Sequence, residues 1–440
     1  KTGIGNESIY NSGYAFCRFI AEYYGSESLK HIMEELSKPF VFSIHRALEK
    51  VTQINSEILY QNFKESLRKN YSDIFEKILR NEIKGRIVLS EGTANLYPVW
   101  APDGEQFGYL SNKKSDFFSQ TSLYVYNLNT EKDTLISSGV QSKAAWNEDG
   151  TKIFYSKKPK YPNKHGSKYF DLFQYDFRQN MESRLTHGSR GFSPVSISDT
   201  TLAYIATFGG FQNIYLFNLN LKQITQITDF SDMRIIHSLY YDNKEKRIIF
   251  DYTFNHFRDI GYYNIQTDIL STMFSNPWDE RSVVQNHDNL IYSDDKTGIF
   301  NLVSVNKASG GKKVITNVIG GAFMPDINSE GQILYSLFEN GKYSIALLNS
   351  IDKTEPPVLR ERSFTFSPPI EIGISGEKQR YKDQFPPMFI LPKIMSDYKT
   401  IKPGFYFYSS EILERLSVFG GASANLEKDI DLFFLFEFKR

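Results

Sequence analysis

The first 83 residues alternate apolar and polar positions with a helical period. Phe16, Ile20 and Tyr23 follow one another at i, i+4 and i+7, which places them on one helix face. Gly25 ends this segment, and Ser26 is the candidate N-cap of the next one. The pattern predicts a small bundle of four short helices. The segments expected to be helical are 11–24, 27–38, 42–50 and 56–71.

From about Arg86 the pattern changes to short alternating strands separated by turn residues. The stretch VWAPDGEQFGYLS at 99–111 returns in altered form as AWNEDGTKIFYS at 145–156. Six such units follow one another, and the second strand of each ends in an aromatic residue. These aromatic residues are Tyr109, Tyr155, Tyr204, Phe250, Tyr292 and Tyr335.

Each unit continues with a polar loop, a third strand and a fourth strand. Four strands in roughly 40–50 residues is the size of a β-propeller blade. Six copies fill residues 92–355, and a blade buries both of its faces only when neighbours stack against it. We therefore predict a propeller at 84–355, in which the isolated strand at 85–90 completes the last blade.

The repeated turns explain why the units resemble each other. In Pro102-Asp103-Gly104 and Asp149-Gly150, the aspartate supplies a side-chain bond and the glycine a positive φ. We interpret these residues as structural turns rather than as catalytic groups.

After residue 355 the pattern changes again. A proline-rich, extended stretch leads into strand-like segments within the last 40 residues. The fold class predicted for the whole chain is mainly β: a helical subdomain at 1–83, a six-bladed propeller, and a linker with a β segment at 356–440.

The composition limits the classes of function that the chain can have. The 440 residues carry 51 basic and 51 acidic side chains, and a nucleic-acid partner is not expected for a chain without basic excess. Cys17 is the single cysteine, which excludes an intrachain disulfide. The chain begins KTGIGNES without methionine, and we read it as the middle of a longer protein, so the missing leader is uninformative.

The motifs of common catalysts are missing from the sequence. No H-E-x-x-H occurs, no two of the seven histidines stand two to five residues apart, and GISGE at 373–377 lacks the last glycine of G-x-S-x-G. We predict no catalytic residue, metal site or cofactor in this chain. The candidate binding residues are Lys157, Lys160 and Lys164 on a lysine-rich loop, and Phe208 and Phe211 as exposed loop aromatics.

The units YPVWAPDGEQFGYLS and AAWNEDGTKIFYS resemble the WD40-like (PD40) repeats of TolB-type propellers in bacterial envelope proteins. The resemblance covers about 270 residues. It implies a six-bladed TolB-like propeller in the cell envelope, periplasmic or associated with the outer membrane. The function it implies is non-catalytic binding of a protein or peptide partner.

Two further resemblances concern the ends of the chain. Residues 1–75 resemble the C-terminal helical part of peptidase MA-like (gluzincin) metallopeptidases. This implies an alternative, in which the chain is the scaffold and substrate-recruiting part of a zinc metallopeptidase. Its H-E-x-x-H helix, and its zinc, would then lie upstream. The C-terminal segment resembles the first strands of an outer-membrane β-barrel, which implies the outer membrane as a further partner.

Overall fold

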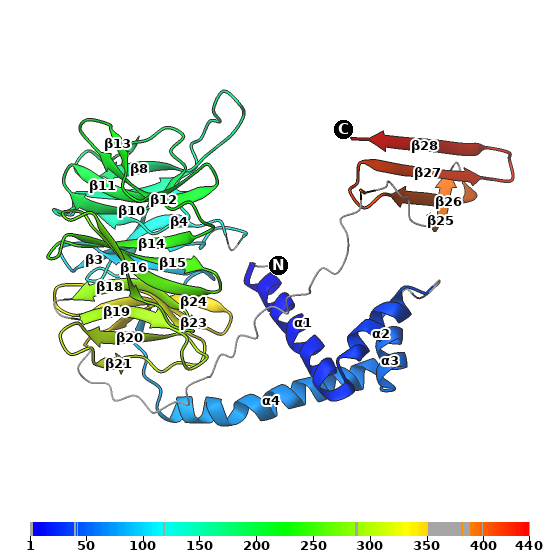
Figure 1. Cartoon of the computed structure of the whole chain (residues 1–440), viewed down its shortest axis with the longest axis horizontal. Helices are drawn as coiled ribbons and strands as arrows, with labels where there is room; N and C mark the ends of the chain where they lie inside the picture. Colours follow the sequence, from blue (N-terminus) through cyan, green and yellow to red (C-terminus); the bar gives the residue numbers. More distant parts are fainter. Residues whose placement is uncertain are drawn as a thin grey trace. The chain divides into compact units, whose positions relative to one another are not determined.

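The computed structural model describes residues 3–38, 41, 43–117, 119–286, 289–350, 380–381, 388–397 and 399–439. The chain divides into two compact units, Lys1–Thr365 and Phe366–Arg440. Figure 1 labels the helices and many of the strands of both units. Most of the predicted proline-rich linker, including 373–377, lies outside the described residues.

Four helices open the first unit, as predicted: α1 (Gly3–Tyr24), α2 (Glu27–Leu36), α3 (Ile44–Thr52) and α4 (Ser56–Arg80). Phe19, Ile20 and Phe63 are buried in their common core. Tyr23, predicted on the buried face, is 64% exposed, so the face that packs is rotated toward Phe19. Ser26 precedes α2 without a side-chain capping bond, contrary to the prediction.

Six four-stranded antiparallel sheets follow, here called blades 1 to 6. Blade 1 is β2 (Asn95–Trp100), β3 (Gln106–Ser111), β4 (Ser122–Asn127) and β5 (Lys132–Ser138); blade 2 is β6 (Ala145–Trp146), β7 (Lys152–Lys157), β8 (Asp171–Asp176) and β9 (Met181–Arg184); blade 3 is β10 (Gly191–Ser198), β11 (Thr201–Phe208), β12 (Phe211–Asn218) and β13 (Ile224–Gln226). Blade 4 is β14 (Ile235–Asp242), β15 (Arg247–Phe254), β16 (Phe257–Asn264) and β17 (Ile269–Phe274); blade 5 is β18 (Glu280–Asn286), β19 (Asn289–Asp294), β20 (Asn301–Asn306) and β21 (Lys312–Val314); blade 6 is β22 (Ala322–Ile327), β23 (Ile333–Glu339), β24 (Lys342–Leu348) and β1 (Arg86–Leu89).

The first strands of the blades form a closed ring. β2 contacts β6, β6 contacts β10, and the series continues through β14, β18 and β22 back to β2. This is the strand order and packing of a β-propeller. The predicted fold class, mainly β with N-terminal helices and a C-terminal β segment, is confirmed.

Blade 6 combines strands from both ends of the propeller. β1 pairs antiparallel with β24, with Arg86 opposite Leu347 and Ile87 opposite Ala346. The backbone N–H of Gly85 donates to the hydroxyl of Tyr335 at 2.8 Å. The predicted closure by the isolated strand is therefore confirmed.

The aromatic residues that mark the repeats fill the spaces between blades. Tyr109 and Tyr155 are fully buried, and each needs a partner for its hydroxyl. Tyr109 donates to Asp133, and Tyr155 donates to Glu182. Burial, strengthened by these carboxylates, raises the pKa of both tyrosines. A carboxylate on the fourth strand, itself still partly open to solvent, thus anchors the second strand.

The second unit contains an antiparallel meander of β25 (Phe389–Asp397), β26 (Thr400–Ser410), β27 (Leu416–Ala424) and β28 (Ile430–Phe438). Neighbouring strands pair in sequence order, without a register shift.

We expect Leu89→Ala to lower the free energy of unfolding of the propeller by about 2–5 kcal/mol, because Leu89 is buried between blades 6 and 1. Ile87→Ala on the same strand is the control: Ile87 is 44% exposed, and we expect a loss below about 1 kcal/mol. Urea unfolding followed by tryptophan fluorescence measures both, since Trp100, Trp146 and Trp278 all lie in the propeller. Equal losses would contradict closure by β1.

Candidate functional site: the central channel

The first strand of each blade lines the central channel, so its two ends define two faces of the propeller. The turns that join first and second strands lie at one end, which we call the hairpin face. The loops that join second and third strands, and one blade to the next, lie at the other end, which we call the loop face. This assignment follows from the antiparallel order of every blade.

A cavity of about 470 Å³ occupies the channel and reaches the hairpin face. Residues from the first strands of blades 1, 2, 3, 4 and 6 line it, and turn residues such as Pro102, Asn243 and Ser329 form its rim. Its walls are largely apolar and aromatic: Trp100, Trp146, Val195, Leu239, Tyr240 and Ile327. Concave, mostly apolar walls with a few polar groups are typical of ligand sites.

Three polar groups are placed at this cavity. Asp326 accepts a hydrogen bond from the backbone N–H of Trp100 at 2.7 Å. Burial raises the pKa of Asp326, and the charge of Lys143 acts in the opposite direction. Lys143 lines the cavity and has no hydrogen bond or ion pair within the described part of the chain. The Nε1 of Trp100 is buried and likewise has no partner there.

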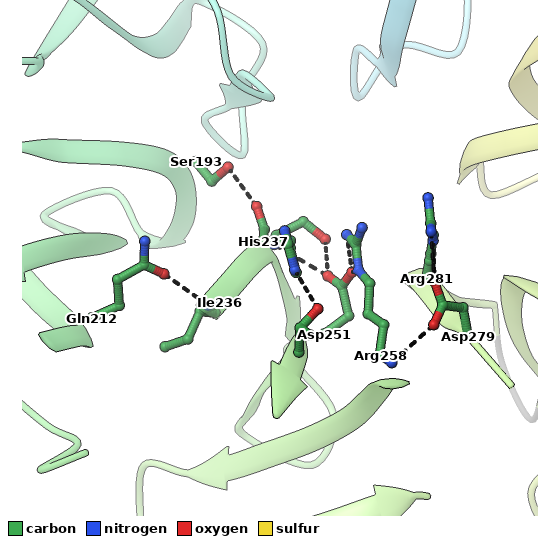
Figure 2. Close-up of polar contacts among 10 residues, drawn as sticks. Ser193, Gln212, Ile236, His237, Asp251, Arg258, Asp279 and Arg281 are labelled. Carbon is green, nitrogen blue, oxygen red and sulfur yellow. Dashed lines mark hydrogen bonds and ion pairs between the residues drawn. The ribbon is translucent and has the colours of Figure 1, made fainter. Parts of the chain in front are cut away.

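An ion-paired network stands at the loop-face end of the channel (Figure 2). The Asp251 carboxylate is fully buried and pairs with the guanidinium of Arg258. It also accepts from the backbone N–H of Ser238 at 3.1 Å. The backbone N–H of Arg258 donates to Asp279 at 3.1 Å, and the Nε of Arg281 donates to the same carboxylate at 3.2 Å. Blades 4 and 5 are thereby joined.

Tyr97 reaches this network from the other side of the ring. Its pKa is raised by burial, and the charges that act on it belong to Arg258, Asp251 and Arg281 of blades 4 and 5. Tyr97 itself lies on β2 of blade 1, at a left-handed φ of 51° where the pairing of β2 with β3 shifts. Such a bulge redirects a side chain, and Tyr97 stands at this bulge within the electrostatic range of the network.

His237 completes the network on β14. Its Nε2 lies 2.9 Å from the Thr253 hydroxyl, and its carbonyl accepts from the Ser193 hydroxyl at 3.2 Å (Figure 2). Burial lowers the pKa of His237 to about 4, and Arg258 adds to the shift. Asp251 shows the opposite balance: burial alone would raise its pKa, but the paired Arg258 keeps it lowered. At neutral pH the network contains a neutral imidazole and a charged carboxylate.

The predicted lysines lie on the loop face, away from the cavity rim. Lys157 is the last residue of β7 rather than a loop residue, and its Nζ is 2.6 Å from Glu182 and 4.9 Å from the centre of the Phe173 ring. Lys160 lies 5.3 Å from the Tyr161 ring, and Lys164 is exposed. Lys157 is therefore engaged within its own blade.

The predicted aromatics also differ from expectation in their local structure. Phe208 ends β11 and Phe211 begins β12, so the two form the last pair of a hairpin whose turn is Gly209-Gly210. Phe208 is 43% exposed and its ring packs edge-on against Tyr215 at 5.5 Å. They are strand residues at the loop face, not loop residues.

The predicted turn residues lie at the hairpin face. Asp103 accepts from the backbone N–H of Glu105 at 2.9 Å, and Gly104 has a φ of 71°. Asp149 accepts from Thr151 N–H at 3.0 Å, and Gly150 also has a φ of 71°. Pro102 additionally contributes to the cavity rim.

Sequence reasoning missed the channel residues. Trp100 and Trp146 directly precede the repeated turns, and this shared position was a usable signal. The network around Asp251 had none, because its members are spread over three blades. Among the described residues, no group of three or more His, Cys, Asp or Glu side chains is placed to hold a metal ion. The described helices include none long and apolar enough to cross a membrane.

Comparisons with known proteins give structural neighbours but no family. No protein-family model matches the chain, and no curated protein matches it. TolB from Acinetobacter baumannii is 17% identical with a TM-score of 0.45, covering 54% of this chain and 58% of TolB. The β-propeller domain of the Trilobed protease from Pyrococcus furiosus is 13% identical with a TM-score of 0.41, covering 57% of this chain and 78% of that domain.

An oligogalacturonate lyase from Vibrio parahaemolyticus is 14% identical with a TM-score of 0.42, covering 59% of this chain and 78% of the lyase. At these identities and TM-scores no functional conclusion follows. The propeller assignment rests on this chain's own strand order and ring of contacts.

We expect His237→Gln to change how stability depends on pH. The folded imidazole has its pKa lowered to about 4, below the unfolded value of 6.5, so acid favours the unfolded chain in this window. The wild-type propeller should lose about 3 kcal/mol more than the variant between about pH 7 and about pH 4.

Urea unfolding followed by tryptophan fluorescence at each pH measures this difference. His165→Gln, on the exposed turn of the 158–170 loop, is the matched control and should behave like wild type. The same pH response from the His237 variant and from wild type would contradict a buried neutral imidazole.

Proposed function

We propose that the propeller is a non-catalytic module that binds a protein or peptide chain through its channel cavity at the hairpin face. The observation that carries this proposal is an apolar cavity that presents an ammonium group with no hydrogen bond or ion pair among the described residues. Lys143 supplies that group, and Trp100 and Trp146 supply flanking aromatic surface. A cavity of about 470 Å³ suits one or two side chains rather than a whole folded domain.

The polar groups define the chemistry of the ligand. Lys143 is suited to a carboxylate, because a charge-assisted hydrogen bond inside an apolar cavity is stronger than one in water. A peptide with an apolar side chain next to an acidic residue, or next to its free C-terminus, places apolar atoms against the cavity walls and a carboxylate against Lys143.

The network around Asp251 supports a ligand site that opens at one face. Its ion pairs and Tyr97 occupy the loop-face end of the channel. Preorganised walls of this kind reduce the entropy lost on binding. The repeat resemblance supports a location in the bacterial cell envelope, and with it an envelope protein as the source of the peptide.

We expect Lys143→Met to weaken peptide binding about tenfold, the value of one charge-assisted hydrogen bond. The probe is an array of immobilised hexapeptides that pair one apolar residue with one acidic residue, with amide counterparts of the acidic residue alongside. Fluorescence polarisation of the best peptide then gives the dissociation constants.

Lys164→Met removes a similar charge from the exposed 158–170 loop and should leave binding within about twofold. Equal weakening by the two variants would show that binding does not depend specifically on Lys143 and would contradict the channel site. No preference for acidic over amide peptides would contradict the role of Lys143.

A further inference from the structure

The pairing of the C-terminal sheet sorts its side chains into two faces. Residues directly opposite each other in a sheet point to the same side, and neighbours along a strand point to opposite sides. One row of residues that lie opposite each other across the four strands consists of Ile390, Phe407, Gly420 and Phe434. The rows two positions away along the strands point to the same side of the sheet, and the adjacent rows point to the other side. Alternate rows therefore define a first face and a second face.

The first face is apolar over all four strands. Its positions are Ile390, Pro392, Ile394, Ser396, Ile401, Pro403, Phe405, Phe407, Ser409, Leu416, Val418, Gly420, Ala422, Ala424, Ile430, Leu432, Phe434, Phe436 and Phe438. None of them is charged. Several large side chains are open to solvent in the described part of the chain, with Leu432 at 77% and Phe434 at 65%.

The second face holds the charged side chains of the strands. Lys402 is 3% exposed and its Nζ lies 3.0 Å from Asp431 on β28. Lys393 lies over the Tyr406 ring at 4.9 Å. Glu437 is on the same face, opposite Ser417. Charge is thus excluded from one side of the sheet and paired or held against aromatic rings on the other.

Charged residues also bound the apolar face at both ends of its strands. Lys399, Glu427 and Lys428 lie in the turns at one end. Glu414, Arg415 and Lys439 lie at the other end. Between these ends the strands have 9, 11, 9 and 9 residues. A tilted strand of about 9–11 residues is the length that crosses the hydrocarbon core of a bilayer.

We propose that the first face of this sheet lies against the acyl chains of a lipid bilayer. Binding to a protein partner would require neither charged residues at both ends of the strands nor strands as long as a bilayer is thick. A sheet face that lies in the hydrocarbon between two aqueous layers requires both features. Among the described residues β25 and β28 are the edge strands of the sheet. In the membrane their outer backbone groups pair with further strands, because unpaired backbone groups are costly in lipid. The proposal is independent of the channel site.

The first experiment compares two arginine substitutions at neighbouring positions of β28 in the full chain. Phe434→Arg places a charge at the centre of the first face, and Leu435→Arg places it on the second. Leu435 is similarly exposed, at 59%. Flotation with vesicles of phosphatidylethanolamine and phosphatidylglycerol should fall at least about tenfold for Phe434→Arg and less than about twofold for Leu435→Arg.

The second experiment holds even if an arginine variant fails to fold. In a Cys17→Ser background, single cysteines introduced by Leu432→Cys, Phe436→Cys and Leu435→Cys carry a polarity-sensitive fluorophore. Nitroxide attached to lipid acyl chains should quench the labels at 432 and 436 strongly and the label at 435 weakly.

Two results would overturn the proposal. In the first, the wild-type chain does not float with vesicles, and its labels at 432 and 436 are shielded in a water-soluble dimer. The face then covers a second copy. In the second, lipid nitroxide quenches all three positions equally, so the sheet has no lipid-facing side.

Discussion

The antiparallel pairing of β1 with β24 is the contact on which the propeller depends. Each blade buries its two faces only against neighbours, so the ring is stable only when its last sheet is complete. β1 supplies that strand from the start of the propeller, and Gly85 adds a hydrogen bond to Tyr335. An added Cβ at Gly85 would meet the Leu347 carbonyl oxygen at 2.5 Å, so the chain approaches blade 6 as closely as glycine permits.

Closure of the ring also creates the channel and its asymmetry. The first strands converge, and Tyr97 stands at a bulge within the electrostatic range of the charges of blades 4 and 5. The Asp251–Arg258 pair is buried there at a desolvation cost, which the guanidinium and the hydrogen bonds from Ser238 help to offset, so the pKa of Asp251 stays lowered. The network occupies the loop-face end of the channel, and the apolar cavity opens at the hairpin face.

The sequence predicted the repeat architecture well, for a physical reason. Strand alternation, turn residues and the recurrent buried tyrosine are local features, and each appears at regular spacing. The prediction of the helical core was less accurate. Phe19 is buried and Tyr23 is not, because the packing of α4 decides which face of α1 is covered. The strand-end position of Phe208 was missed because Gly209-Gly210 makes a tighter turn than the loop expected there.

The candidate site was predicted far less well, because its residues meet only after the ring closes. Lys143, Asp326 and Trp100 come from three blades, and no spacing in the chain brings them together. The lysines favoured by the sequence are conspicuous because they are many and close, but Lys157 is neutralised by Glu182. A charge run in a loop is typical of a solvated surface, whereas we propose that the single lysine beside two tryptophans binds a ligand. Lys143 differs from the loop lysines because it lies in an apolar cavity with no hydrogen bond or ion pair among the described residues. Only the folded structure reveals this difference.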